Sequence, residues 1–202
     1  MSRFLFILLA VFSFQTASAA GILVWGDSLS AGYGIPQDKA WPKLLATRLA
    51  SEGYKHEISN ASISGETTAG GLARLPEALS RIKPAVVIIE LGANDGLRGL
   101  PVKAMQGNLD AMIRLATKAN ARVLLVGMRM PPNFGPVYTQ KFQQVFTDLA
   151  AQHRTALVPF MMEGFAGRSE LFQNDNLHPT AEAQSLVLDN IWPALKPLLG
   201  KR

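Results

Sequence analysis

The sequence predicts an α/β fold built around a doubly wound parallel sheet with helices on both sides. Short β-rich runs alternate with longer helical patterns from residue 22 onwards, and such alternation is typical of parallel strands joined by right-handed helical crossovers. Two of the runs, at residues 86–89 and 123–126, are continuously apolar. They suit central strands that helices cover on both faces.

The expected elements follow one another in a regular order. The first strand is the apolar run Ile-Leu-Val-Trp at residues 22–25, and the third contains the β-branched run Val-Val-Ile-Ile. Both residue classes favour strands over helices in short runs. Strands are expected at residues 22–25, 56–62, 86–91, 122–127 and 155–158, and helices at residues 41–51, 72–82, 102–119, 138–153 and 180–198.

The composition indicates one globular domain over residues 20–202. The chain has 202 residues, of which 48% are hydrophobic and 17% charged, and this length allows a sizeable core. No linker or repeat divides it. Cysteine is absent, which excludes a thiol nucleophile, a cysteine-ligated metal and disulfides.

The first residues have the features of a secretory signal peptide. A basic start is followed by an apolar run at residues 4–14 and by small residues that offer an Ala-x-Ala cleavage site. The run is about half of the roughly 20 residues that span a bilayer, so we do not expect a membrane anchor. The sequence predicts a signal peptide at residues 1–19 and an exported protein.

The charge pattern argues against nucleic acid as a partner. The net charge is +5, which could favour anionic lipid surfaces. Lysine and arginine are scattered, however, and form no run or stripe, so a nucleic-acid interface is disfavoured.

Chemistry-bearing residues follow successive strands of the predicted sheet. Ser28 comes just after the first strand, Gly65 after the second and Asn94 after the third, while Asp175 and His178 lie in the loop before the last helix. Ligands of such sheets bind beyond the carboxyl ends of the strands, where the winding direction reverses. We therefore expect all five residues at one edge.

Ser28, His178 and Asp175 are the candidates for a catalytic triad. A serine hydroxyl needs an imidazole to accept its proton and a third group to hold that imidazole in the right tautomer, and the Asp-x-x-His spacing supplies both from one loop. Two structural alternatives remain: Ser28 as a turn or helix-capping serine, and His178 as a buried, hydrogen-bonded residue before Pro179. The other histidines, His56 and His153, fit surface or core roles, and without a His-Glu-x-x-His segment we expect no metal site.

Three donors are candidates for an oxyanion hole, which acyl transfer requires. They are the backbone N–H groups of Ser28 and Gly65 and the side-chain amide of Asn94. Gly65 as an ordinary turn glycine and Asn94 as a residue that bonds its own backbone are the alternatives. Asp27 and Ser30 are interpreted as residues that stabilise the turn.

Four segments together resemble the SGNH hydrolases, also called the GDSL family. They are Gly26-Asp27-Ser28-Leu29, Gly65, Gly92-Ala93-Asn94-Asp95 and Asp175-Asn176-Leu177-His178. The resemblance covers essentially the whole chain after the signal peptide and is strongest to a bacterial subgroup of periplasmic thioesterase/protease/lysophospholipases and arylesterases. Members often have Gly where this chain has Ala93, which could crowd the oxyanion loop, and Asp where it has Glu66.

The resemblance implies a flavodoxin-like three-layer α/β/α fold with a five-stranded parallel sheet. It implies Ser28 as nucleophile, His178 as base, Asp175 as its orienting carboxylate, and Gly65 and Asn94 as oxyanion donors. The implied reaction is hydrolysis of carboxylic esters and thioesters through an acyl-enzyme, in the periplasm and without a cofactor. A lysophospholipid is one candidate substrate, whose phosphate Arg98 or Arg129 could meet.

Substrate selection is expected in the loops at residues 96–101 and 128–135. Leu97, Leu100, Met130 and Phe134 could line an acyl groove, or they could cap the core. Two other functions remain open. One is a carbohydrate-ester deacetylase, and the other is a non-catalytic lipid- or sugar-binding module on the same fold, since fold alone does not determine function.

Overall fold

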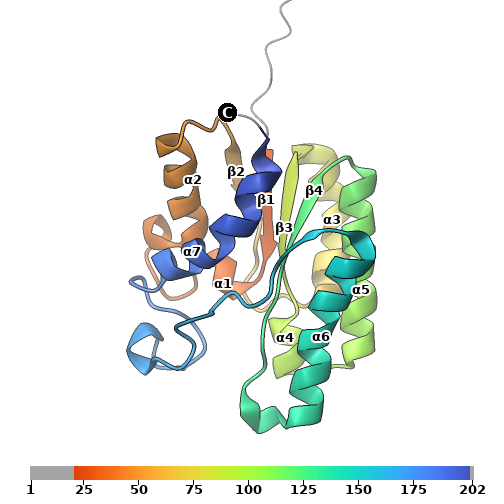
Figure 1. Ribbon diagram of the computed structural model, residues 1–202, viewed down its shortest axis with the longest axis vertical. Coiled ribbons are helices and arrows are strands. Elements are labelled where there is room, and N and C mark those ends of the chain that lie inside the picture. Colours follow the sequence, from red (N-terminus) through yellow and green to blue (C-terminus); the bar gives the residue numbers. More distant parts are fainter. Residues whose placement is uncertain (1–20, 201–202) are drawn as a thin grey trace, which may run out of the picture.

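The computed structural model describes residues 21–200 as a five-stranded parallel sheet between two layers of helices (Figure 1). The strand order is β2-β1-β3-β4-β5, and every neighbouring pair is parallel. This confirms the predicted fold class. The signal peptide predicted at residues 1–19 lies outside the described residues.

The strands and main helices lie close to where the sequence predicts them. The strands are β1 Gly21–Gly26, β2 Glu57–Asn60, β3 Val86–Glu90, β4 Arg122–Val126 and β5 Ala156–Val158. The helices are α1 Ser28–Ala31, α2 Trp41–Ser51, α3 Thr68–Ile82, α4 Ala93–Leu97, α5 Val102–Lys118, α6 Pro136–His153 and α7 Gln184–Leu195, with 3-10 turns at Gln37–Lys39, Pro132–Phe134, Ser169–Leu171 and Lys196–Leu199. Over residues 21–200, none of these helices combines the length and the apolar character that a bilayer crossing needs.

The sheet reverses its winding direction between β1 and β3. Helices α2 and α7 cover one face, and α3, α5 and α6 cover the other (Figure 1). Strand β1 pairs with β2 on one side and with β3 on the other, and Val24 pairs with both Asn60 and Ile88. The carboxyl ends of β1 and β3 therefore flank the switch point, where ligands of such sheets bind.

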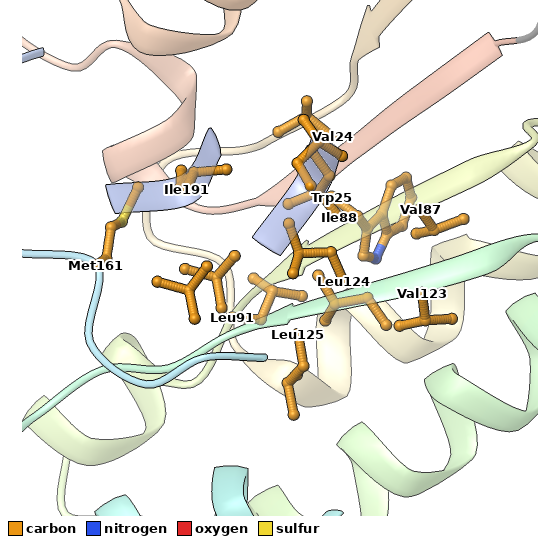
Figure 2. Packing of buried hydrophobic residues seen from close by; sticks show 14 of the residues in the cluster. Val24, Trp25, Val87, Ile88, Leu91, Val123, Leu124, Leu125, Met161 and Ile191 are labelled. Atoms are coloured by element: carbon orange, nitrogen blue, oxygen red, sulfur yellow. The ribbon is translucent and has the colours of Figure 1, made fainter. Parts of the chain in front are cut away.

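A continuous apolar core supports this edge from both faces of the sheet. Strand β3 is fully buried along its length, as its apolar run predicts. Figure 2 shows the side chains of Val24, Ile88 and Leu124 one below another, with Ile191 of α7 and Met161 in the left part of the view. Because interiors are packed to crystal-like density, the strand ends can be displaced only at considerable cost.

The structure differs from the sequence prediction mainly at helix starts and in two short helices. Helix α3 begins at Thr68 instead of residue 72, because the Thr67 side chain accepts a hydrogen bond from Gly70 N and caps the helix. Helix α7 begins at Gln184 instead of residue 180. Helices α1 and α4, which the sequence did not predict, follow β1 and β3 directly.

Two helical glycines provide a matched test of how tightly α3 packs on the sheet. A Cβ at Gly71 would lie 2.4 Å from Leu91 Cδ1, whereas a Cβ at Gly107 of α5 would meet nothing within 4 Å. We expect Gly71→Ala to lower the free energy of unfolding by about 1–3 kcal/mol through overpacking, and Gly107→Ala to raise it by up to about 1 kcal/mol through helix propensity. Urea denaturation measures both, and equal effects would contradict this packing.

Candidate active site

The turn after β1 presents the Ser28 hydroxyl at the carboxyl edge of the sheet. Strand β1 ends at Gly26, the Asp27 side chain caps the next helix by accepting from Leu29 N at 3.0 Å, and Ser28 is the first residue of α1. A Cβ at Gly26 would lie 2.6 Å from Glu90 Oε2. Only glycine therefore lets the turn lie so close to the end of β3.

His178 joins Ser28 to Asp175 in one hydrogen-bonded chain. His178 Nε2 lies 2.8 Å from Ser28 Oγ, and His178 Nδ1 lies 2.6 Å from Asp175 Oδ2. Asp175 Oδ1 accepts from the backbone N–H groups of Leu177 and His178 at 2.9 and 3.0 Å. The carboxylate thus fixes the ring and its own loop together, and Nε2 faces the serine.

The Asp175 carboxylate is held in its charged form. Partial burial works in the opposite direction, but the N–H groups of His178 and Leu177, together with the His178 ring, lower the pKa of Asp175 to about 2. Hydrogen bonds to the charged form of an acid favour that form. Asp175 is therefore ionised wherever the imidazole can act as a base.

Gln173 ties the serine loop to the histidine loop. Its Nε2 donates to Tyr33 O at 2.8 Å and to Pro179 O at 3.2 Å, while its backbone N–H donates to His178 O at 2.8 Å. The Tyr33 ring packs on the His178 ring with centroids 4.7 Å apart. Sequence analysis identified neither residue as part of the site, although Gln173 lies only two positions before Asp175.

The three candidate oxyanion donors differ in whether they already form hydrogen bonds within the protein. Neither the Ser28 nor the Gly65 backbone N–H donates to a protein acceptor within residues 21–200, and Gly65 has a left-handed φ of 78°. Asn94 Nδ2 donates to Asp27 Oδ2 at 2.9 Å and to Glu66 O at 3.1 Å. Both protons of this amide are thus already in use.

The two departures from the family pattern leave the site intact. Glu66 forms an ion pair with Arg74, whose guanidinium lies 4.0 Å from the centroid of the Trp25 ring and also donates to Ala61 O. Ala93 is 6% exposed and lines the cavity beside the nucleophile. The longer Glu66 side chain therefore anchors the Gly65 loop to α3.

Two buried carboxyl groups lie beneath the nucleophile. Asp27 is 1% exposed and Glu90 is completely buried. Glu90 Oε2 accepts from Ser30 Oγ at 2.7 Å and from Asp27 N at 3.4 Å, while Glu90 Oε1 has no partner in the described chain. Burial raises the pKa of Asp27 to about 6 and, with the Asp27 charge, raises the pKa of Glu90 well above its usual value.

A cavity of about 630 Å³ opens beside Ser28 and His178. Its volume is in the range of small-molecule sites, which are mostly apolar with a few polar groups. Most of its wall is apolar, and its apolar lining comprises Leu29, Ala93, Leu97, Met128, Met130, Pro131, Pro132, Phe160, Met162, Ala166, Phe172 and Leu177. Its polar lining comprises Asp27, Ser28, Asn94, Arg129, Asn176 and His178.

Only two of the four residues predicted to line an acyl groove line this cavity. Leu97 and Met130 line it, whereas Leu100 and Phe134 do not. Phe134 stacks on Tyr138, and the Leu100 carbonyl accepts from the Tyr138 hydroxyl at 3.4 Å. Sequence analysis gave no role to Ala166 and Phe172, which line the cavity from the β5–α7 connection, because that segment has no regular periodicity from which its orientation could be predicted.

No cluster of three or more histidine, aspartate or glutamate side chains in the described part of the chain could hold a metal ion. His153 pairs with Asp110 at 2.7 Å between α5 and α6, far along the sequence from the serine loop. Among the polar groups that line the cavity, the Ser28 hydroxyl and the His178 imidazole are those that acyl transfer requires.

Comparison with known proteins identifies the family. The model of the GDSL-like Lipase/Acylhydrolase family matches residues 24–186, which include Ser28, Asn94 and Asp175. The chain belongs to this family. It is therefore an ester hydrolase, as the resemblance of its sequence motifs implies.

Individual relatives cover nearly the whole chain. Esterase TesA of Pseudomonas aeruginosa is 51% identical over 185 residues, 92% of each chain. The thioesterase 1/protease 1/lysophospholipase L1 of Escherichia coli is 39% identical over 195 residues, 96% of this chain and 92% of the relative. The crystal structure of the psychrotrophic esterase EstA from Pseudoalteromonas sp., inhibited by monoethylphosphonate, has a TM-score of 0.84 and 45% identity and covers 90% of this chain and 99% of EstA.

The buried carboxyl groups give the fold a distinctive pH dependence. The folded state holds protons on Asp27 and Glu90 that the unfolded chain releases. The free energy of unfolding should therefore fall as the pH rises from about 4 through 6. Glu90→Gln removes one of these groups. We therefore expect the unfolding free energy of the variant to fall less steeply with rising pH than that of wild type, the two slopes differing by up to about 1.4 kcal/mol per pH unit.

Guanidinium denaturation between pH 4 and 8 measures this difference. The control is Glu77→Gln, which changes an exposed carboxyl group on α3. A Glu90→Gln profile parallel to that of wild type would show that Glu90 titrates normally.

Gln173 should act on the rate of reaction more than on substrate affinity. Without its two side-chain hydrogen bonds the Ser28 and His178 loops can drift apart, and a misplacement of about 1 Å costs up to about 100-fold in rate. We expect Gln173→Ala, and Gln173→Glu which keeps the shape but not the donors, to lower kcat about 10- to 100-fold with little change in KM.

Steady-state kinetics on a soluble ester tests this role. Gln144→Ala, which removes an exposed glutamine on α6 that bonds Asp148, is the matched control. Wild-type kcat in Gln173→Glu would contradict a positioning role.

Proposed function

We propose that this enzyme hydrolyses carboxylic esters and thioesters through an acyl-enzyme formed on Ser28. The observation that carries this proposal is the continuous chain from Ser28 Oγ to His178 Nε2, 2.8 Å, and from His178 Nδ1 to Asp175 Oδ2, 2.6 Å. A purely structural serine or histidine would not require this arrangement beside an open cavity.

The reaction proceeds in two steps on these groups. Ser28 Oγ attacks the carbonyl carbon while its proton passes to His178 Nε2, and Asp175 stabilises the resulting imidazolium through Nδ1–H. The tetrahedral intermediate expels the alcohol or thiol, which takes the proton from Nε2. Water then attacks the acyl-enzyme, again giving its proton to His178, and the acid leaves with Ser28 restored.

The oxyanion is stabilised by the N–H groups of Ser28 and Gly65, with the amide of Asn94 as the third donor. The two backbone donors have no protein acceptor within the described chain, which supports this role. Asn94 donates to Asp27 and Glu66 O in the free enzyme, so its participation requires one of these hydrogen bonds to be shared with the oxyanion or exchanged for it. Losing one oxyanion donor typically costs about 3 kcal/mol of barrier lowering.

An acyl chain is the part of the substrate that fits the cavity. Leu97, Met130 and Met162 give it an apolar and adaptable wall, which favours fatty acyl esters over carbohydrate acetates. The name of the Escherichia coli relative joins thioesterase with lysophospholipase, and both activities cleave an acyl chain from a polar group. We propose lysophospholipids as the physiological substrate class.

We further propose that residues 1–19 direct export to the periplasm and that residues 20–202 form the mature enzyme. The short apolar run and the Ala-x-Ala site support this proposal. Export separates the enzyme from cytoplasmic coenzyme A, which favours lipid esters as natural substrates.

Ser28→Ala should abolish hydrolysis of p-nitrophenyl esters. Without the hydroxyl no acyl-enzyme can form, so we expect kcat/KM to fall by at least about 1,000-fold, while Ser80→Ala on the exposed face of α3 stays at the wild-type value. An acetyl-to-palmitoyl series measures both variants, with an alkyl phosphonate ester as a probe of the serine. A folded Ser28→Ala protein with wild-type rates would exclude Ser28 as nucleophile.

The same preparation distinguishes the substrate proposals. Fatty-acid release from lysophosphatidylethanolamine is compared with release of acetate from acetylated sugars at equal enzyme concentration. Turnover of the sugar esters alone would replace the lysophospholipid proposal by the deacetylase alternative.

A further inference from the structure

Within residues 21–200, the large exposed hydrophobic side chains all follow the carboxyl ends of strands, at one edge of the sheet. They come from the loops and helix starts that follow the strands, in the lower part of Figure 1, where α1, α4 and the start of α6 lie. Within residues 21–200 they are Tyr33, Ile63, Leu97, Leu100, Val137 and Leu177, between 37% and 66% exposed. We call these six side chains the apolar rim.

Three of the six rim side chains lie at the active site. Leu97 and Leu177 line the cavity, and Tyr33 packs on the ring of His178. Ile63 lies in the same loop as Gly65, and Val137 follows the loop that carries Met130. The opposite edge of the sheet and the outer faces of the helices carry no comparable side chain in the described part of the chain. Such a concentration of apolar surface is typical of interaction sites.

Basic side chains are interleaved with the rim along one connection. The segment from Leu97 to Lys103 carries two basic residues, Arg98 and Lys103, on either side of Leu100, and both are exposed. Neither forms an ion pair within the described residues, and the only hydrogen bond that the Arg98 side chain donates there is to the carbonyl of Gly65. Cations beside exposed apolar side chains match a surface that presents phosphate groups over hydrocarbon.

The other charged side chains around the cavity largely neutralise one another. Arg129 pairs with Glu163 at 3.0 Å and Arg168 with Glu170 at 2.9 Å, while Asp175 is held by His178. The rim can therefore approach an anionic surface without facing a cluster of unpaired carboxylates.

We propose that the apolar rim docks the enzyme onto a phospholipid surface that contains anionic lipids, with the cavity mouth facing the lipid. This inference rests on the proposed function, since a lysophospholipid substrate resides in such a surface. Docked in this way, an acyl chain passes from the lipid into the apolar cavity without crossing bulk water. A second copy of the chain seated on the rim would instead close the cavity mouth.

Binding is tested on a catalytically silent protein so that turnover plays no part. Residues 21–200 contain every described element and the whole described core, so the chain from residue 20 is used with the Ser28→Ala change. Sedimentation with vesicles of phosphatidylcholine and phosphatidylglycerol gives the lipid concentration for half-maximal binding, and size-exclusion chromatography gives the oligomeric state.

Two sets of variants separate the rim from the rest of the surface. Ile63→Ser combined with Val137→Ser removes two rim side chains that line no part of the cavity. Lys103→Glu and Lys118→Glu change exposed lysines in the first and last turns of the same helix, α5, at the rim and at the opposite edge.

We expect the double serine variant to need at least about tenfold more lipid, because it loses several apolar carbon atoms and each buried methylene group contributes about 0.8 kcal/mol to membrane binding. Lys103→Glu should weaken binding about fivefold and Lys118→Glu should leave it unchanged, since one basic residue near an anionic surface contributes about 1 kcal/mol. In the active background, all three variants should hydrolyse p-nitrophenyl acetate at the wild-type rate.

Equal binding by all variants, no binding by the parent protein, or a dimer that the serine variant disrupts would each overturn the proposal. Loss of vesicle binding with intact ester hydrolysis implicates the rim alone. Failure of lysophospholipid hydrolysis with intact vesicle binding would instead count against the proposed substrate.

Discussion

The contact between Ser28 and His178 is the interaction on which this active site depends. It joins the first loop of the fold to the last, between residues that are 150 positions apart in the sequence. No local interaction could hold such a contact at 2.8 Å. It persists because both loops extend from a parallel sheet whose central strands, β1, β3 and β4, are paired in register and buried, so that the sheet acts as a common support.

The site also requires unfavourable burial of charge-bearing groups. Asp27 and Glu90 lie in the tightly packed region where β1 and β3 end, and burial favours their neutral forms. In return, the Asp27 carboxyl caps α1 and holds the amide of Asn94 next to the nucleophile. The burial of these two carboxyl groups lowers the stability of the folded state at neutral pH. The hydrogen bond from Asn94 to Asp27 fixes the position of the oxyanion loop.

The sequence was sufficient to predict the features that depend on long or regular patterns. The apolar run of β3 and the repeated strand–helix alternation predicted the sheet, and the carboxyl-edge rule then placed Ser28 and His178 together. Helices α1 and α4 were missed because they are only four and five residues long, too short for a helical pattern to show in the sequence.

Features that depend on contacts between distant segments could not be predicted in the same way. Gln173 acts through backbone carbonyls of Tyr33 and Pro179, and nothing in its own sequence neighbourhood indicates which carbonyls will be near. Likewise, Leu97 at the end of α4 and Leu100 three residues later are equally exposed leucines, but only Leu97 lines the cavity. Side-chain direction in irregular segments follows from the packed structure and not from residue type.

The two ends of the described chain lie away from the catalytic edge. Strand β1 starts at Gly21 at the amino edge of the sheet, and Gly200 lies near Arg122, the first residue of β4 (Figure 1). A carrier, a solid support or a second enzyme fused at the carboxyl terminus would therefore project from the opposite end of the molecule. An immobilised form of this hydrolase would present its cavity mouth outward, to a substrate emulsion.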